Sequence, residues 1–180
     1  MTEAKFEQCI RQMNEGDKDG LREVYEEYIS YIYGIVFQMI GNKENAEDIT
    51  SEFFIKLWEK SASYKPGSGH RGWMATIARN MTIDFIRKYK REELTDTFED
   101  TAEGHSRSSS VEDQVVNQSL IKDALETLSE KEREVIHMKV MGDMTLKEIA
   151  AVLEVPMGTV AWRYREAVNK LRRCGFEQGF

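Results

Sequence analysis

Two groups of basic side chains carry the chemistry that this sequence suggests most clearly. Residues 61–91 contain seven Lys and Arg side chains and one acid, interleaved with Trp73, Phe85 and Tyr89. Residues 157–173 contain five basic side chains and a single acid, Glu166. Guanidinium and ammonium groups bind phosphates, and aromatic rings stack on unpaired bases. Either group alone could be a solvated helix face, but two such groups favour a protein that contacts a polyanion at two places.

The net charge of the chain conceals these groups. The 180 residues carry a formal charge of −7 and a pI near 5.2, which argues against a protein that coats nucleic acid non-specifically. The acids are concentrated elsewhere, because residues 1–60 sum to −6 and residues 92–120 to −7. The acidity of the total therefore does not exclude DNA binding.

Signals for a catalytic, metal-binding or membrane-spanning protein are absent from the sequence. Cys9 and Cys174 stand at opposite ends, and the three histidines are scattered, so neither residue type has metal-ligand spacing. No Gly-rich phosphate loop or hydrolase motif is present. The longest uncharged apolar-rich stretch, residues 28–40, has thirteen residues, fewer than the ~20 that cross a bilayer. We expect a cytoplasmic protein with reduced cysteines and no cofactor, metal or catalytic residue.

Helical periodicity dominates the N-terminal half of the chain. Apolar residues recur at helical spacing through 21–40 and 49–58, with a weaker segment around Phe6. The Ser/Pro/Gly-rich stretch 61–71 predicts a loop, and a long helix is predicted over 72–91. Apolar stripes of this kind face the core, and the residues expected there include Phe53, Phe54, Leu57 and Met81.

A change in composition separates this region from a second helical one. Residues 94–118 are acidic, rich in Ser and poor in apolar residues, so they cannot offset chain entropy and predict a flexible linker. Beyond them, capping-box patterns at Ser129 and Thr145 begin two helices. The sequence therefore predicts an all-α fold with two small helical domains, 1–93 and 119–180, joined by this linker.

Residues 145–173 have the arrangement of a helix-turn-helix: a short helix, a turn at 154–155 and a long helix that begins near Pro156. In this motif the second helix enters the major groove and the first braces it. The core-facing stripe is expected to be Val160, Tyr164, Val168 and Leu171. The exposed side is then expected to hold Thr159, Ala161, Trp162, Arg163, Arg165 and Glu166. An ordinary helical hairpin with a basic outer face has the same pattern, and the residues alone leave it open.

The loop and helix over 61–91 suit a different form of DNA. A positively charged helix with aromatic side chains fits a single strand, whose bases can stack, and a preceding loop could accept an extruded base. An amphipathic helix with a solvated Lys/Arg tail explains the periodicity equally well.

Three stretches of the chain together resemble the extracytoplasmic-function sigma factors of bacterial RNA polymerase, which belong to the sigma-70 family. ENAEDITSEFFIKLW (44–58) and RGWMATIARNMTIDFIRKYKR (71–91) resemble region 2 of that family. LSEKEREVIHMKVMGDMTLKEIAAVLEVPMGTVAWRYREAVNKLRR (128–173) resembles region 4. The resemblance implies a transcription initiation factor without catalytic activity, which directs core polymerase to promoters and promotes DNA melting.

The resemblance also implies three sets of functional residues. The −10 set, which would read the −10 element as a single strand, comprises Ser63, Lys65, His70, Arg71, Trp73, Arg79, Asn80, Asp84, Arg87 and Lys88. The −35 set, which would read duplex DNA, comprises Gly158, Thr159, Ala161, Trp162, Arg163, Arg165, Lys170 and Arg172. The docking set, which would bind the β′ clamp helices of core RNA polymerase, comprises Glu47, Asp48, Ser51 and Glu52. Further implied partners are the β flap and an anti-sigma protein, with no small-molecule substrate.

The chain departs from the family pattern at three positions. Ser51 stands where Gln is usual, which could alter a contact with core polymerase. Ala161 and Trp162 stand where a cation and Ser are usual. Loss of the cation removes an expected DNA contact, so the −35 sequence read could differ from the family's common one. Trp162 could stack on a sugar, meet a thymine methyl or pack on another protein.

A second function remains open on the residues alone. A repressor or activator acting without polymerase would use residues 1–91 as a sensing domain and would bind its duplex tightly by itself. A sigma-like chain would need core polymerase for the same affinity. An enzyme is disfavoured, because the motifs named above are missing.

Overall fold

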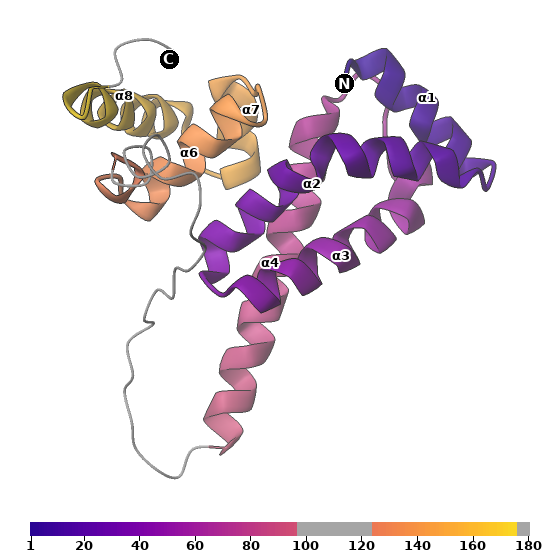
Figure 1. The fold of residues 1–180 in the computed structure, drawn as a ribbon, viewed down its shortest axis with the longest axis horizontal. Coiled ribbons are helices and arrows are strands. Elements are labelled where there is room, and N and C mark those ends of the chain that lie inside the picture. Colours follow the sequence, from indigo (N-terminus) through magenta and orange to yellow (C-terminus); the bar gives the residue numbers. More distant parts are fainter. Residues whose placement is uncertain (97–123, 176–180) are drawn as a thin grey trace, which may run out of the picture. The chain divides into compact units, whose positions relative to one another are not determined.

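The computed structural model describes residues 1–96 and 124–175, with side chains for 1–91 and 124–175. The chain divides into two compact units, with the described parts 1–96 and 124–175 falling in one each. Within these parts every regular element is a helix (Figure 1). No described helix is both long and apolar enough to cross a membrane. The all-α prediction is confirmed, whereas most of the predicted linker, 94–118, lies outside the described residues.

The described part of the first unit, 1–96, contains four α-helices and one turn of 3-10 helix. These are α1 (Glu3–Asn14), α2 (Lys18–Ile40), α3 (Lys43–Lys60), η1 (Ser61–Ser63) and α4 (His70–Asp96). Side-chain oxygens of Thr2, Asp17 and Asn42 accept backbone N–H bonds at the starts of α1, α2 and α3. Helices α2 and α3 pack on the first half of α4, whose second half extends beyond them (Figure 1).

The turns between the first helices are set by local sequence. Gly41 has a φ of 71°, which is the left-handed conformation that ends α2. Gly20 lies where α1 and α2 cross, and a Cβ at this position would stand 2.5 Å from the carbonyl oxygen of Cys9. A side chain there would therefore force the two helices apart.

The core of the first unit confirms most of the predicted buried residues. Phe53 and Leu57 are fully buried and Phe54 is 4% exposed. Met81 was wrongly placed in the core, since it is only half-buried. The buried residues of α4 are instead His70, Met74, Ala75, Ile77, Ala78 and Thr82. A spacing of four residues identifies a stripe, but it does not say which of two neighbouring stripes faces the core.

The described part of the second unit, 124–175, is built around three helices, α6 (Glu130–Val140), α7 (Leu146–Leu153) and α8 (Met157–Arg173), preceded by a helical turn at residues 124–126. Both predicted capping boxes are confirmed: Ser129 with Glu132 begins α6, and Thr145 with Glu148 begins α7. One core cluster joins α8 to the residues before α6 and to α6 itself. Its members are Ala124, Leu128, Ile136, Ala167, Val168 and Leu171, with Tyr164 packed against them.

Candidate nucleic-acid interface

The turn between α7 and α8 fixes the helix-turn-helix. Helix α7 ends at Glu154, which takes the left-handed conformation with a φ of 54°. Pro156 is the N-cap of α8, one residue before the first helical turn that the sequence predicted for it. The side chain of Pro156 offers no cap, so the first backbone N–H groups of α8 have no side-chain acceptor. They form a positive helix end, which attracts phosphate.

The outer side of α8 carries most of the −35 set. Val160, Val168 and Leu171 face the core as predicted. Trp162 is 56% exposed, and the other exposed members of the set are Gly158, Arg165 and Arg172. Three flanking members are half-buried, namely Thr159, Ala161 and Arg163. An aromatic ring and two guanidinium groups therefore share one accessible side of the helix.

Lys170 of the −35 set is engaged in an ion pair within the second unit, and its predicted DNA contact stays a prediction. Its ammonium group donates to both carboxylate oxygens of Glu132, at 2.7 and 3.0 Å. Glu132 is 5% exposed and also accepts bonds from the backbone N–H and hydroxyl of Ser129. Burial alone would raise the pKa of Glu132, but the bonds from Lys170 and Ser129 lower it below the ordinary value. Lys170 therefore neutralises a buried carboxylate of the fold.

A groove between α3, η1 and α4 collects part of the −10 set. It has a volume of about 810 Å³. Four members of the set line it: Ser63, Trp73, Asn80 and Asp84. The sequence reasoning missed Lys56 and Lys60, which lie one helical turn apart on α3 and also line the groove. The sequence signal for them was their spacing of four residues, which places two cations on one helix face just before the predicted loop.

The remaining members of the −10 set lie around this groove. Lys65 is exposed on the loop, and Arg87 and Lys88 are exposed on the second half of α4. Arg71 and Arg79 are half-buried, and one guanidinium nitrogen of Arg71 lies 3.5 Å from the carbonyl oxygen of Met1. The groove and the exposed cations of α4 belong to the same unit.

His70 is the member of the −10 set that the structure does not place on the surface. Its side chain is 3% exposed. Its Nε2 lies 2.6 Å from the Tyr28 hydroxyl, its Nδ1 bonds the carboxylate of Glu3, and its ring stacks on Phe6. Both ring nitrogens are thus occupied inside the protein, so the predicted DNA contact by His70 is corrected to an internal role.

The docking set forms one exposed face of α3. Glu47, Asp48, Ser51 and Glu52 are all exposed. Ile55, which sequence reasoning missed, lies on the same face one turn further and is 63% exposed. An acidic face with an exposed isoleucine is unsuited to DNA and suited to another protein.

A side-chain cluster suited to metal binding does not appear in the described part of the chain. Residues 1–96 and 124–175 contain no cluster of three His, Cys, Asp or Glu side chains that could hold a metal ion. Cys9 is buried and Cys174 exposed, and both are free thiols. Burial raises the pKa of the Cys9 thiol, which keeps it protonated and unreactive.

Family models match both units. The model described as sigma-70 region 2 matches residues 24–92, and the model described as sigma-70 region 4 matches residues 124–173. The chain is similar to the ECF RNA polymerase sigma factor SigW of Bacillus subtilis (strain 168), with 32% identity across 95% of this chain and 97% of that protein. It is also similar to the ECF RNA polymerase sigma factor RpoE of Cereibacter sphaeroides, with 28% identity across 87% of each.

Two solved structures share the fold. One is the sigma factor RpoE in complex with the anti-sigma factor NepR from Bartonella quintana, with a TM-score of 0.64 and 23% identity over 90% of this chain and 99% of that one. The other is CnrH in complex with the cytosolic domain of CnrY, with a TM-score of 0.61 and 18% identity over 97% and 99%. At these sequence identities the similarity shows a shared fold and nothing about function.

Proposed function

The chain belongs to the extracytoplasmic-function sigma factors of the sigma-70 family, and we propose that it reads promoters with the two surfaces described above. As a sigma factor it directs core RNA polymerase to promoters and supports initiation of transcription. The observation that carries the proposal is the accessible side of α8, where Trp162, Arg165 and Arg172 are exposed on a helix whose N-terminus has no side-chain cap.

In the proposed −35 interaction, α8 enters the major groove of the duplex. Arg165 and Arg172 bind phosphates and fix the position of the helix, while Arg163 and Trp162 lie against base edges. Gly158 has no neighbour within 4 Å of an added Cβ, so the first turn of α8 is open to a phosphate. Because Ala161 offers no cation, Trp162 and Arg163 are the side chains that mainly select the −35 sequence.

In the proposed −10 interaction, the groove of the first unit takes the unpaired strand. Trp73 offers a ring on which a base can stack, and Asn80 offers an amide for hydrogen bonds. Lys56 and Lys60 supply positive charge beside them, although Glu59 pairs with Lys56 at 2.8 Å. The exposed cations Arg87 and Lys88 then follow the phosphate backbone along α4.

The proposed protein partners follow from the remaining surfaces. The docking set, with Ile55, meets the β′ clamp helices, and the second unit meets the β flap. The two solved relatives are bound by an anti-sigma factor and by a cytosolic domain, and we propose that a protein of this kind also binds this chain. We place the chain in the cytoplasm, where core polymerase acts, and assign it no catalytic activity of its own.

Run-off transcription from a randomised promoter pool tests this function. Core polymerase with the protein is expected to produce transcripts that core polymerase alone does not, and sequencing of the templates gives the −35 and −10 elements. The variant Trp162→Ala should shift the selected −35 sequence but not the −10 sequence, and Asn80→Ala should do the reverse. No protein-dependent transcript with any of several bacterial core enzymes would contradict the proposal.

A further inference from the structure

The loop between η1 and α4 is bonded to α1 along its length. The carboxylate of Glu3 accepts a hydrogen bond from the Tyr64 hydroxyl at the start of the loop and another from His70 Nδ1 at its end. The backbone N–H of His70 also points to Glu3, at 3.4 Å. Between these points, the N–H of Gly67 donates to Glu7 at 3.1 Å. Two carboxylates of α1 therefore hold the start, middle and end of the loop.

Aromatic packing reinforces these bonds. Phe6, which is fully buried, lies on the same side of α1 as Glu3. Its ring stands 4.6 Å from the ring of His70 and 5.2 Å from that of Tyr64, and 6.3 Å from that of the groove residue Trp73. The residue that supports the loop thus also contacts the ring that we assign to base stacking.

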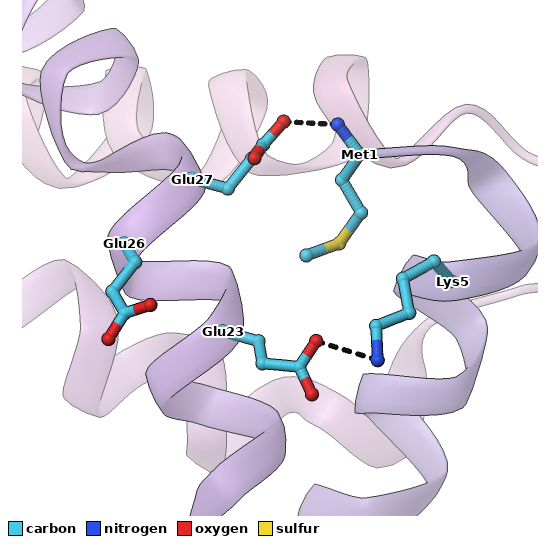
Figure 2. Close-up of a pocket in the computed structure, with 5 residues that line it drawn as sticks. All are labelled: Met1, Lys5, Glu23, Glu26 and Glu27. Atoms are coloured by element: carbon cyan, nitrogen blue, oxygen red, sulfur yellow. Dashed lines mark hydrogen bonds and ion pairs between the residues drawn. The ribbon is translucent and has the colours of Figure 1, made fainter.

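Helix α1 forms ion pairs with α2, so it can support the loop. Lys5 pairs with Glu23 at 2.6 Å across a hollow of about 350 Å³, and the N-terminal amine pairs with Glu27 (Figure 2). In Figure 2 the carboxylates of Glu23 and Glu27, which form these two ion pairs, point toward α1. Because Gly20 also lets α1 approach α2 closely, contacts outside the loop hold α1 in place.

The loop has little structure of its own to hold it. Gly67 and Gly69 have positive φ values of 74° and 83°, and residues 65–68 are all exposed. One turn bond, from the Ser68 N–H to the Lys65 carbonyl at 3.1 Å, lies within it. Ordering a residue costs roughly 1–2 kcal/mol of backbone entropy, so external bonds decide which conformation such a loop keeps.

The state of the Glu3 carboxyl suits this task. Burial raises its pKa, but the hydrogen bonds from Tyr64 and His70 lower it, and on balance it lies below the ordinary value. Burial lowers the pKa of His70, so its ring is neutral at pH 7. A neutral ring that donates from Nδ1 to Glu3 accepts at Nε2 from the Tyr28 hydroxyl, and each polar atom of the cluster then has a fitting partner.

We propose that Glu3 and Glu7 are positioning residues for promoter reading: they fix loop 64–70, which runs between the groove residues Ser63 and Trp73, and so hold the groove in the one shape that selects an unpaired −10 base. The inference rests on the proposed −10 role of the groove. It assigns to α1 a part in DNA choice although α1 carries no member of the −10 set.

The test compares Glu3→Gln and Glu7→Gln with the control Glu15→Gln, which makes the same charge change at the other end of α1. Holoenzymes are titrated with promoters that carry a pre-opened −10 region, with each base or an abasic site at every unpaired position. We expect Glu3→Gln to lower the ratio of affinities between the best and worst base by about three- to tenfold, which corresponds to the loss of one ordinary hydrogen bond. Glu7→Gln should lower it less, and Glu15→Gln should leave it unchanged.

The abasic DNA separates positioning from a general loss of structure. With no base to grip, Glu3→Gln and the unchanged protein should bind equally, and their affinity for core polymerase should agree within about twofold. Equal weakening on every DNA, the abasic one included, would overturn the inference. If circular dichroism shows that Glu3→Gln does not fold, the same comparison of abasic with base-bearing DNA is made with Glu7→Gln. The contact of Glu7 with the Gly67 N–H is exposed.

A groove variant, Ser63→Ala with Asn80→Ala, distinguishes this inference from the proposed function. Full selectivity in both α1 variants, with reduced selectivity in the groove variant, would overturn the inference alone. Full selectivity in all of them would overturn the −10 assignment as well.

Discussion

Trp162 stands in the middle of the accessible side of α8, where it is 56% exposed and the preceding residue is Ala161. A large apolar ring at this place offers contact to a thymine methyl or a sugar but no charge. Arg165, on the same side, offers charge but, as a phosphate contact, no sequence information. We therefore expect substitutions of Trp162 and Arg165 to have different effects on DNA binding.

Trp162→Ala should weaken holoenzyme binding at one −35 base pair by ~1–3 kcal/mol, and leave the salt dependence unchanged. Arg165→Ala should weaken all −35 sequences alike and lower the slope of log affinity against log salt by about one. Fluorescence titration at several salt concentrations with a set of single-base promoter variants measures both effects. A uniform loss with Trp162→Ala, combined with a lower slope, would remove its proposed reading role.

Lys170 is a residue of the fold, and its substitution should affect stability. Lys170→Met would leave the nearly buried carboxylate of Glu132 without its charged donor, which costs about 1–3 kcal/mol. Arg172→Met, exposed two residues further, is the matched control and should leave stability within about 0.5 kcal/mol. Urea denaturation of the full chain measures the difference. Equal stability of both variants would show that the ion pair does not support α6 and α8.

His70 makes the stability of the first unit depend on pH. Burial lowers the pKa of its ring below the ordinary value in the folded state, so the unfolded chain binds a proton first as the pH falls. The unfolding free energy should therefore be constant above about pH 7.5 and decline as the pH falls through 6.5, the ordinary pKa of histidine. The lowered pKa of Glu3 adds a further decline below its own ordinary range.

Urea denaturation at pH 5.5 and 7.5 checks this expectation. His70→Gln, which has no titrating ring, should lose less stability between the two values than the unchanged protein does. The same loss in both proteins would assign the dependence to other groups.

The crossing of helices α1 and α2 requires a residue without a Cβ at position 20. Gly20→Ala would improve the intrinsic helix propensity of α2 by up to ~1 kcal/mol, but its Cβ would meet the Cys9 carbonyl at 2.5 Å. Overpacking of this kind costs roughly 1–3 kcal/mol, so we expect net destabilisation. Gly158→Ala is the control, because nothing lies within 4 Å of its added Cβ, and it should not destabilise α8. Thermal unfolding followed by circular dichroism would contradict the crossing geometry if Gly20→Ala raised the melting temperature.

Elements with local signals were predictable from the sequence. The capping boxes at Ser129 and Thr145 join residues three apart, and both begin helices as expected. The long helix was placed correctly but extends from His70 to Asp96, beyond the predicted 72–91. Helix ends of this sort depend on tertiary contacts, here the bonds of His70 to Glu3 and Tyr28.

The internal partners of His70 and Lys170 could not be predicted from the sequence for the same reason. His70 and Glu3 are 67 residues apart, and Lys170 and Glu132 are 38 apart. No periodicity in the sequence reports such a pairing, so both side chains looked like free DNA contacts. Trp162 and Arg165 were predicted correctly as exposed, because the apolar stripe of α8 fixes its opposite side.

At the scale of the whole molecule, the charge of −7 takes on a structural meaning. Acids occupy the exposed docking face of α3 and the stretch 92–120, while cations gather on α4 and α8. A chain of this charge has little non-specific affinity for DNA. We therefore expect promoter recognition to need core polymerase, which supplies the remaining affinity.

Footprinting on a promoter taken from the pool selection tests this central claim most directly. The protein, core polymerase and their mixture are each probed with DNase I for duplex protection and with permanganate for unpaired thymines. The account predicts that neither component alone protects the promoter at physiological salt, and that the mixture protects the −35 region and exposes unpaired thymines in the −10 region. Sequence-specific protection by the protein alone, without unpaired thymines in the mixture, would contradict it and would favour a stand-alone regulator.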